Sequence, residues 1–344
     1  MSYLKKIRFA LAGCGHIAKK HAEAIKAIED AELVAVCDSE PVALKTFVSK
    51  YGIKGYGLYQ ELLQDREVDV VTICAPSGLH AAMGIAAARA GKNVLVEKPV
   101  AITLEEADAL IENCERAGVV LGVVHQNRFK PAITQLKSTV ERGGFGKITH
   151  ANATVRWNRN PNYYTLRPWG RLKNMGGGAL MNQAIHNIDL LQWMMGKVVS
   201  VFGYTSSSLG LTEAEDTGTA VLKFENGALG VIEASTAIYP QNLEETLSIF
   251  GEKGTAIIGG TSIGEIKKWV FSDQELSVAS IANQASTGSE PLHQCCVRDM
   301  VRAVRCREKP LVDGKEGRKV LEIISAIYQS GVSGQEIVLT PLEQ

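Results

Sequence analysis

Short apolar runs alternate with amphipathic stretches along the first 125 residues of the chain. Runs of this length are typical of buried parallel strands, and the stretches between them have helical spacing. The expected strands are residues 7–12, 32–38, 56–59, 68–74, 93–96 and 119–124, and the expected helices include 16–28, 41–50, 80–91 and 104–117. This alternation predicts an α/β region built on a doubly wound parallel sheet.

From residue 147 onward the pattern changes. Residues 148–157 alternate apolar and polar positions, as a strand with one solvated or ligand-facing side does. A long loop rich in Asn, Arg, Tyr and Trp follows and leads through three glycines into a helix-like run, ALMNQAIHNIDLLQWMM. Further on we expect strands over 198–260 with hairpin turns at 225–227 and 251–254, amphipathic helices at 291–308 and 314–330, and a closing strand, QEIVLT.

The overall composition excludes several classes of protein. The 344 residues include 37 Lys+Arg and 37 Asp+Glu, so the formal net charge is zero, which argues against disorder and against a charge-driven nucleic-acid binder. The seven cysteines form no CxxC pair and no zinc-ligand spacing, so we expect no metal and a cytoplasmic location. No apolar stretch approaches the ~20 residues that span a membrane.

A glycine motif follows the first strand. Gly13, Gly15 and Ala18 form a GxGxxA pattern between an expected strand and helix, which favours close approach of the backbone to a pyrophosphate. Asp38 ends the second strand, where a carboxylate accepts hydrogen bonds from the hydroxyls of an adenosine ribose. Because a carboxylate there repels a ribose phosphate, the motif predicts NAD rather than NADP as cofactor.

Several motifs stand at strand ends in a particular order: GCGHIA, APSGLH, EKP and HQNR, with GGGALMNQAIHNIDLL downstream. Together they resemble the glucose–fructose oxidoreductase / inositol dehydrogenase (Gfo/Idh/MocA) family. The resemblance implies an N-terminal Rossmann domain, a C-terminal domain with a large, mostly antiparallel sheet, and oxidation or reduction of a sugar-like substrate. We place the Rossmann domain at residues 1–127 and the second domain at 128–344, with the helices about 291–330 packing back on the first domain. The expected cofactor contacts are Gly13, Gly15, His16, Ile17, Asp38, Ala75, Pro76, Ser77, His80, Glu97, Lys98 and Gln126.

Three residues are candidates for chemistry. Lys98 ends an expected buried strand, where its ammonium can bind a reacting hydroxyl, and the resemblance implies that family members use this lysine. His186 titrates near neutral pH and can take a proton, with Asn182 four residues before it on the same helix face. Many family members have an aspartate at the position of Asn182, so whether Lys98 or His186 is the base stays open. The alternative is a helix histidine satisfied by Asp189.

A basic segment precedes this helix. No acidic residue occurs between Glu141 and Asp189, so arginines there can bind an anionic substrate, with aromatic side chains for a sugar or base. The expected substrate contacts are Asn127, Arg128, Arg156, Asn158, Tyr163, Tyr164, Arg167, Arg171 and Asn182. In the alternative, these arginines pair with acids of a later stretch, namely Glu213, Glu215, Asp216, Glu225, Glu233, Glu244 and Glu245.

Within the family, the segments YPQNLEETLSIFGEKGTAIIGG and EIKKWVFSD are similar to the bacterial UDP-N-acetylglucosaminuronate 3-dehydrogenases. This similarity implies an NAD-dependent oxidation of the 3-hydroxyl of that nucleotide sugar. The alternatives are a dehydrogenase of a free sugar or inositol, and a non-catalytic NAD-sensing regulatory protein. We expect a small anionic substrate, no nucleic-acid or membrane partner, and a homodimer or homotetramer assembled through the C-terminal sheet.

Overall fold

The structure is a computed structural model that describes residues 5–165, 168–272 and 290–339. Its internal contacts divide the chain into two compact units. The first unit comprises Met1–Gln126 and Glu290–Arg318, and the second comprises Asn127–Ser289 and Lys319–Gln344.

The first unit is built on a parallel sheet with the strand order β3-β2-β1-β4-β5-β6. The order reverses between β1 and β4, and a crevice at the carboxyl ends of the strands is the usual ligand site of such a sheet. The strands are β1 (Ile7–Ala12), β2 (Ala31–Cys37), β3 (Lys54–Tyr56), β4 (Val70–Ile73), β5 (Asn93–Glu97) and β6 (Leu121–Val124).

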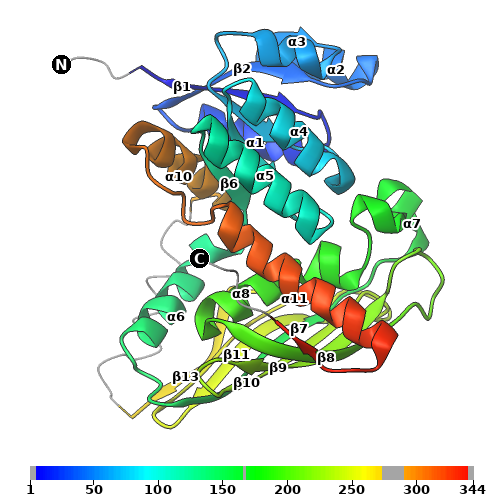
Figure 1. Cartoon of the computed structure of the whole chain (residues 1–344), viewed down its shortest axis with the longest axis vertical. Coiled ribbons are helices and arrows are strands. Elements are labelled where there is room, and N and C mark those ends of the chain that lie inside the picture. Colours follow the sequence, from blue (N-terminus) through cyan, green and yellow to red (C-terminus); the bar gives the residue numbers. More distant parts are fainter. Residues whose placement is uncertain (1–4, 166–167, 273–289, 340–344) are drawn as a thin grey trace. The chain divides into compact units, whose positions relative to one another are not determined.

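Helices of the first unit pack in pairs. α4 lies against α5, and α1 lies against α10, which comes from the C-terminal part of the chain (Figure 1). Local sequence fixes their ends: Thr103 and Glu106 form a capping box at the start of α5, and Gly118 ends it in the left-handed conformation. The helices are α1 (His16–Lys26), α2 (Pro41–Tyr51), α3 (Tyr59–Gln64), α4 (His80–Arg89), α5 (Leu104–Ala117) and α10 (Leu292–Cys306).

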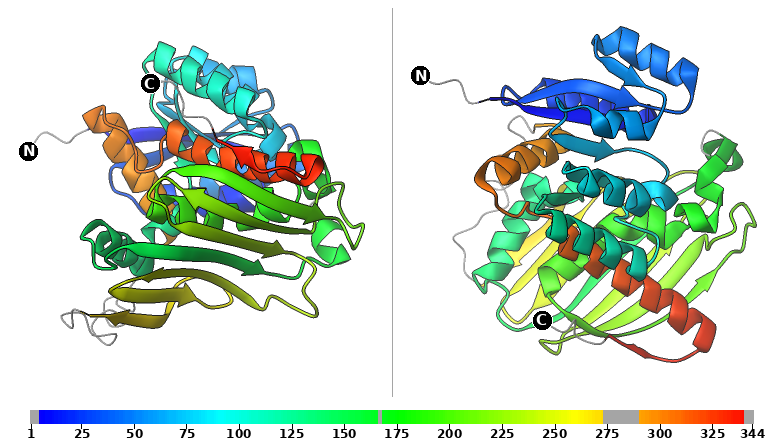
Figure 2. Two further views of the ribbon diagram at one scale, coloured as in Figure 1. Left: turned by 60° about the horizontal axis from the view of Figure 1, so that its bottom comes forward. Right: turned by 45° about the horizontal axis from the view of Figure 1, so that its top comes forward.

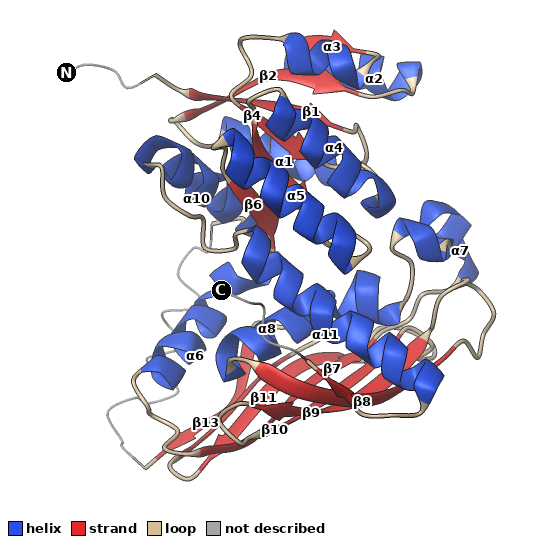
Figure 3. Cartoon of the chain, viewed as in Figure 1, coloured by secondary structure: helices blue, strands red, loops and turns tan. Residues whose placement is uncertain are grey.

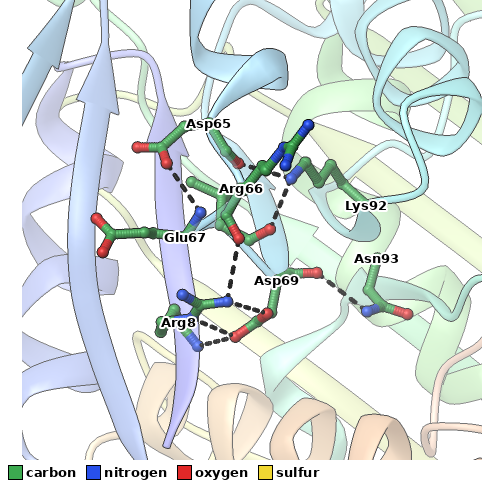
Figure 4. A network of polar contacts seen from close by, with 8 residues as sticks. Arg8, Asp65, Arg66, Glu67, Asp69, Lys92 and Asn93 are labelled. Carbon is green, nitrogen blue, oxygen red and sulfur yellow. Dashed lines mark hydrogen bonds and ion pairs between the residues drawn. The ribbon is translucent and has the colours of Figure 1, made fainter.

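The amino edge of this sheet carries a closed network of polar contacts (Figure 4). The Arg8 guanidinium donates to both carboxylate oxygens of Asp69, at 2.8 and 2.9 Å. The Lys92 ammonium donates to the carbonyl oxygens of Asp65 and Val68 at 2.7 and 2.9 Å, and the Asn93 amide donates to the Asp69 carbonyl at 3.0 Å. The network ties together the starts of β1, β4 and β5 with donors and acceptors of the chain itself.

The second unit contains a sheet with the order β13-β12-β11-β7-β10-β9-β8-β14. Neighbouring strands run antiparallel except β7 and β10, which are parallel. The strands are β7 (Ile148–Arg156), β8 (Val198–Ser206), β9 (Thr217–Phe224), β10 (Leu229–Ser235), β11 (Glu244–Gly251), β12 (Gly254–Gly259), β13 (Glu265–Phe271) and β14 (Ile337–Val338). The predicted fold class, a Rossmann-type parallel sheet followed by a large, mostly antiparallel sheet, is confirmed.

Helices cover one face of this sheet (Figure 3). They are α6 (Pro131–Glu141), α8 (Ile185–Met195) and the later turns of α11 (Gly314–Ser333). The opposite face comes forward in the left view of Figure 2 and carries exposed apolar side chains, among them Val221 and Val231, which are paired neighbours on β9 and β10.

The strand expected at residues 56–59 lies instead at Lys54–Tyr56, and α3 begins at Tyr59. Two further elements differ from the sequence prediction. The helix-like run from Ala179 begins as a π-helical turn, Ala179–Ala184, before α8 continues it. The expected long loop contains short helical turns at Pro161–Thr165, Pro168–Arg171 and Lys173–Met175. Both differences depend on contacts with distant residues, which hydrophobic spacing along the chain does not report.

Candidate functional site

The glycine motif forms the turn between β1 and α1. Gly13 has a φ of +108°, and a Cβ there would lie 2.8 Å from the carbonyl oxygen of Cys74, so only glycine fits. A Cβ on Gly15 would meet no atom within 4 Å, and Gly15 is the N-cap of α1 without a side-chain cap. The His16 and Ile17 amides therefore begin a helix whose amino end faces open space, which fits the pyrophosphate of a dinucleotide.

Asp38 follows β2 and is tied to the same turn. One carboxylate oxygen accepts the Cys14 amide N–H at 2.6 Å, and the other accepts the Glu40 amide N–H at 2.8 Å. The carboxylate is half-buried, so part of it remains accessible to a ribose. This arrangement fits an NAD ribose and disfavours the phosphate of NADP.

The loop after β4 is held by a histidine. Ser77 is buried and Ala75 and Pro76 are half-buried. The ring of His80 lies 2.7 Å from the Pro99 carbonyl oxygen and 3.0 Å from that of Ala75, and the residue is 1% exposed. Burial lowers the pKa of His80 despite these two carbonyl contacts. The ring joins the loops that follow β4 and β5, and contact of His80 with the cofactor stays a prediction.

Glu97 ends β5 and its carboxylate is turned into the unit. Its Oε1 lies 2.7 Å from Nε2 of His21 on α1 and 3.8 Å from Nε2 of His293 on α10. Burial by itself raises the pKa of Glu97, but the hydrogen bond with His21 and the charges around it lower that pKa to about 2. Oε1 of Glu97 is therefore engaged by His21 within the first unit, and contact of Glu97 with NAD stays a prediction.

His21 and His293 were missed by sequence reasoning. The ligand atoms of His21, Glu97 and His293 all lie within 4.8 Å of one another, a donor set that can hold a metal ion. The contact between Nε2 of His21 and Oε1 of Glu97, at 2.7 Å, has the length of a hydrogen bond, which accounts for the pair. A histidine on the buried face of each of two amphipathic helices is a weak signal, because spacing does not show that the helices pack together.

Lys98 differs from its neighbours in exposure. In the run Val94–Ala101 every residue is buried except Lys98, which is half-buried. Its backbone N–H donates to Oε2 of Glu97 at 3.3 Å. Gln126, after β6, is likewise half-buried. Lys98 is therefore the accessible residue of an otherwise buried segment at the carboxyl edge of the sheet.

The second unit repeats this pattern on the π-helical turn and α8. From Ala179 to Gln192 every residue is buried except Asn182 and His186. A π turn contains more residues than an α turn, and such turns occur frequently at functional sites. The predicted pair is therefore the part of this buried run that reaches solvent.

Arg128 is fully buried and pairs with an acid of the second unit. It is 0% exposed, and its guanidinium donates to both carboxylate oxygens of Asp189 on α8, at 2.6 and 2.9 Å. It also lies over the ring of Trp193 at 4.9 Å. This bidentate pair gives the Arg128 guanidinium a partner within the second unit, and contact of Arg128 with substrate stays a prediction.

Arg156 also pairs within the chain. Its guanidinium donates twice to Glu233 on β10 at 2.6 Å and once to Glu244 on β11. Strand register explains the contact, because Glu244 stands directly opposite Arg156. For Arg156 the structure shows the alternative of the sequence analysis, in which an arginine of the basic segment pairs with the later acids.

The other predicted substrate contacts are distributed over the loop. Tyr164 is buried and burial raises its pKa, whereas Tyr163 is half-buried and accepts a hydrogen bond from the Gln183 amide at 3.0 Å. The Asn158 amide donates to the Ile238 carbonyl at 2.6 Å, and the Arg171 guanidinium donates to the Leu211 carbonyl at 3.0 Å. Asn127 is buried, and Arg167 lies outside the described residues.

Arg159, which was not among the predicted contacts, joins this loop to the π-helical turn. Its guanidinium donates to Oε1 of Gln183 at 2.8 and 3.2 Å and to Oδ1 of Asn242 at 3.1 Å. It also lies over the rings of Trp157 and Tyr163, at 4.7 and 4.8 Å. Arg159 therefore holds the aromatic loop in place rather than offering an open anion site.

Known proteins resemble both parts of the chain. Residues 7–125 match the oxidoreductase family with an NAD-binding Rossmann fold, and residues 133–257 match the GFO/IDH/MocA C-terminal domain. The myo-inositol 2-dehydrogenase of Thermotoga maritima is 30% identical over 334 residues, covering 92% of this chain and 93% of that protein.

None of the described helices is long and apolar enough to cross a membrane.

Two solved structures are more similar. The WlbA dehydrogenase from Bordetella pertussis, in complex with NADH and UDP-GlcNAcA, is 37% identical with a TM-score of 0.94, over 98% of this chain and 99% of that one. The WlbA dehydrogenase from Chromobacterium violaceum, with the same two ligands, is 38% identical with a TM-score of 0.93, over 99% and 98%. The glycine turn, the acid after β2 and these matches agree: the chain belongs to the Gfo/Idh/MocA family and is an NAD-dependent dehydrogenase of the sugar type.

Proposed function

We propose that this protein oxidises the 3-hydroxyl of UDP-N-acetylglucosaminuronate with NAD. The observation that carries the proposal is the end-to-end similarity to two dehydrogenases that bind NADH and UDP-GlcNAcA, at 37% and 38% identity. The half-buried members of otherwise buried segments, Lys98, Asn182 and His186, supply the side chains that such a reaction needs.

The proposed chemistry removes a hydride and a proton from one secondary alcohol. Bound NAD supplies the ring that accepts the hydride from the substrate carbon. If His186 is the base, the Lys98 ammonium donates a hydrogen bond to the reacting oxygen and the neutral imidazole takes the hydroxyl proton as the carbonyl forms. If Lys98 is the base, its neutral amine takes that proton. Asn182 orients the hydroxyl or the His186 ring through its amide.

Either Lys98 or His186 can be the base. Asn182 bears no charge, so it cannot stabilise an imidazolium as an aspartate would. A pH–rate profile distinguishes the two: if His186 is the base, the acid limb of kcat/KM disappears in His186→Asn and persists in Lys98→Met. Persistence of the limb in His186→Asn assigns the base to Lys98.

A thermal-shift panel tests the substrate. With NAD present, we expect UDP-GlcNAcA to raise the Tm by several degrees, because a ligand that binds only the folded state stabilises it. UDP-GlcNAc, which has the same nucleotide without the carboxylate, is the matched control and should give a smaller shift. Stabilisation by myo-inositol or a free sugar, without any shift from UDP-sugars, contradicts the proposal.

A second candidate function is the oxidation of inositol or a free sugar. The 30% identity to a myo-inositol 2-dehydrogenase over 92% of the chain favours it. Mass spectrometry of the ligand that copurifies with the protein separates the candidates. A non-catalytic NAD-sensing role is contradicted if any substrate in the panel reduces NAD.

We further propose that copies of this chain assemble through the bare face of the eight-stranded sheet. Val221, Val231 and Leu229 are exposed on adjoining strands, and an apolar patch of this kind is typical of a subunit interface. Val221→Glu should lower the mass measured by light scattering to that of a smaller assembly, and an unchanged mass contradicts this proposal.

The seven free cysteines favour action in the reducing cytoplasm.

A further inference from the structure

We infer that Glu215 is a positioning residue, whose carboxylate fixes the π-helical turn that carries Asn182 and leads into His186. The inference deepens the proposed function, because it rests on these two residues acting at the site. All the residues concerned belong to the second unit.

Glu215 holds the first two amides of the turn. Its Oε1 accepts the Leu180 N–H at 2.8 Å, and its backbone carbonyl accepts the Ala179 N–H at 2.9 Å. These donors begin a helical segment and have no acceptor in the preceding turn of helix. One residue from the strand region before β9 therefore sets where the turn starts.

Gly178 shows that the fit is tight. It has a φ of +111°, and a Cβ there would lie 2.6 Å from both oxygens of the Glu215 carboxylate. No other residue type can occupy this position without displacing the carboxylate. Glycine is therefore required at position 178 for two reasons: its positive φ, and the close approach of the Glu215 carboxylate.

The Glu215 carboxylate is buried and accepts hydrogen bonds from neutral groups, and the charge of Lys173 acts on it as well. Glu215 is 8% exposed, and the Tyr328 hydroxyl on α11 donates to the same Oε1 at 3.1 Å. Burial raises the pKa of Glu215 to about 7. Burying an acid costs free energy unless its oxygens accept hydrogen bonds, and Oε1 of Glu215 accepts two, from Leu180 and Tyr328.

The turn itself needs such support. A π turn is rare and less well packed than an α turn, so it persists where outside contacts fix it. If the Glu215 contact is lost, the segment can rewind toward α geometry. Rewinding shifts Asn182 relative to His186, because the number of residues per turn between them changes.

The test compares Glu215→Ala, Glu215→Gln and the control Glu225→Gln. Glu225 is an exposed glutamate paired with Lys197 at 3.0 Å, so its variant should behave as wild type. We expect Glu215→Ala to lower kcat at least tenfold with the KM for NAD unchanged within twofold. Glu215→Gln keeps an acceptor oxygen for the Leu180 N–H and should restore kcat to within threefold of wild type. Amide exchange at Leu180 should accelerate at least tenfold in Glu215→Ala alone.

Wild-type kcat and wild-type Leu180 exchange in Glu215→Ala overturn the inference. If Glu215→Ala does not fold, Glu215→Asp replaces it, because the shorter side chain withdraws the carboxylate from Leu180; the same two outcomes then decide. The wild-type enzyme is assayed first. Failure of the wild type to oxidise UDP-GlcNAcA contradicts the proposed function, whereas the exchange measurement still tests Glu215, with kcat taken on whichever sugar the wild type oxidises.

Discussion

Two buried glutamates, one in each unit, have opposite electrostatic surroundings. Glu97 lies 2.7 Å from the His21 imidazole, and its pKa is lowered to about 2. Glu215 contacts a backbone amide and the Tyr328 hydroxyl, and burial raises its pKa to about 7. The first acid stands immediately before Lys98, and the second supports the turn that bears Asn182.

The difference shows that burial alone does not determine the charge of a carboxyl group. At Glu97 the hydrogen bond with His21 outweighs desolvation and lowers the pKa. At Glu215 desolvation outweighs the hydrogen bonds and the charge of Lys173, and the pKa rises. Each glutamate accepts a backbone N–H next to or near a half-buried site residue: Glu97 accepts that of Lys98, and Glu215 accepts that of Leu180.

The largest expected effect comes from removing the side chains proposed for catalysis. Lys98→Ala and His186→Ala should each lower kcat by about 10²–10⁴-fold, because each removes a proton-transfer or hydroxyl-binding group. NADH formation at 340 nm measures this, and circular dichroism checks the fold. If both variants keep wild-type rates, the assignment of the site is wrong.

Glu97→Gln and Glu215→Gln should differ in stability. Glu97→Gln removes the charge that faces His21 inside the protein, and breaking a buried pair costs about 3–5 kcal/mol. Glu215→Gln keeps its acceptor and should change the free energy of unfolding by less than about 1 kcal/mol at pH 7. Urea denaturation measures the free energy of unfolding of both variants. Equal decreases in Glu97→Gln and Glu215→Gln would contradict the expected difference between the two glutamates.

The pH dependence of stability should also separate the regions. The pKa of Glu215 is raised from 4.5 to about 7, so the folded state binds the proton more tightly and stability falls as pH rises through that window. Burial lowers the pKa of His293 from 6.5 to about 4, so stability falls as pH decreases from 6.5 toward 4. Each contribution is at most about 3 kcal/mol.

Variants test the sign of each contribution. Between pH 5 and pH 8, Glu215→Gln should lose less stability than the wild type, and between pH 6.5 and pH 4.5, His293→Gln should lose less. Denaturation curves at these pH values give the differences. A Glu215→Gln curve parallel to that of the wild type shows that Glu215 is ionised throughout.

A smaller effect is expected at Asp38. Asp38→Asn removes the charge that repels a 2′-phosphate while an amide oxygen can still accept the Cys14 N–H. The preference for NAD over NADP, measured as the ratio of kcat/KM values, should fall by about tenfold, equivalent to roughly 1.4 kcal/mol. An unchanged ratio assigns the selectivity to other residues.

The first unit was largely predictable from sequence because its features are local. Gly13, Asp38 and Lys98 stand at strand ends, and the carboxyl ends of parallel strands meet at one edge by topology. Strand β1 lies over the predicted residues 7–12, and α5 over the predicted residues 104–117.

The second unit was less predictable because its contacts join residues far apart in sequence. Arg128 with Asp189, Arg156 with Glu233, and Glu215 with Leu180 are separated by 61, 77 and 35 positions. Residue type showed that arginines and acids were available, but only the register of β7, β10 and β11 determines which of them meet. The π turn left no signal in hydrophobic spacing for the same reason.

The rate of NAD reduction with UDP-GlcNAcA, compared with the rate with myo-inositol, tests the central claim most directly. The wild-type protein should form NADH with UDP-GlcNAcA at a kcat/KM at least a hundredfold above that for myo-inositol, and Lys98→Ala should abolish the signal. Faster turnover of myo-inositol, or an equal signal from Lys98→Ala, would contradict the account.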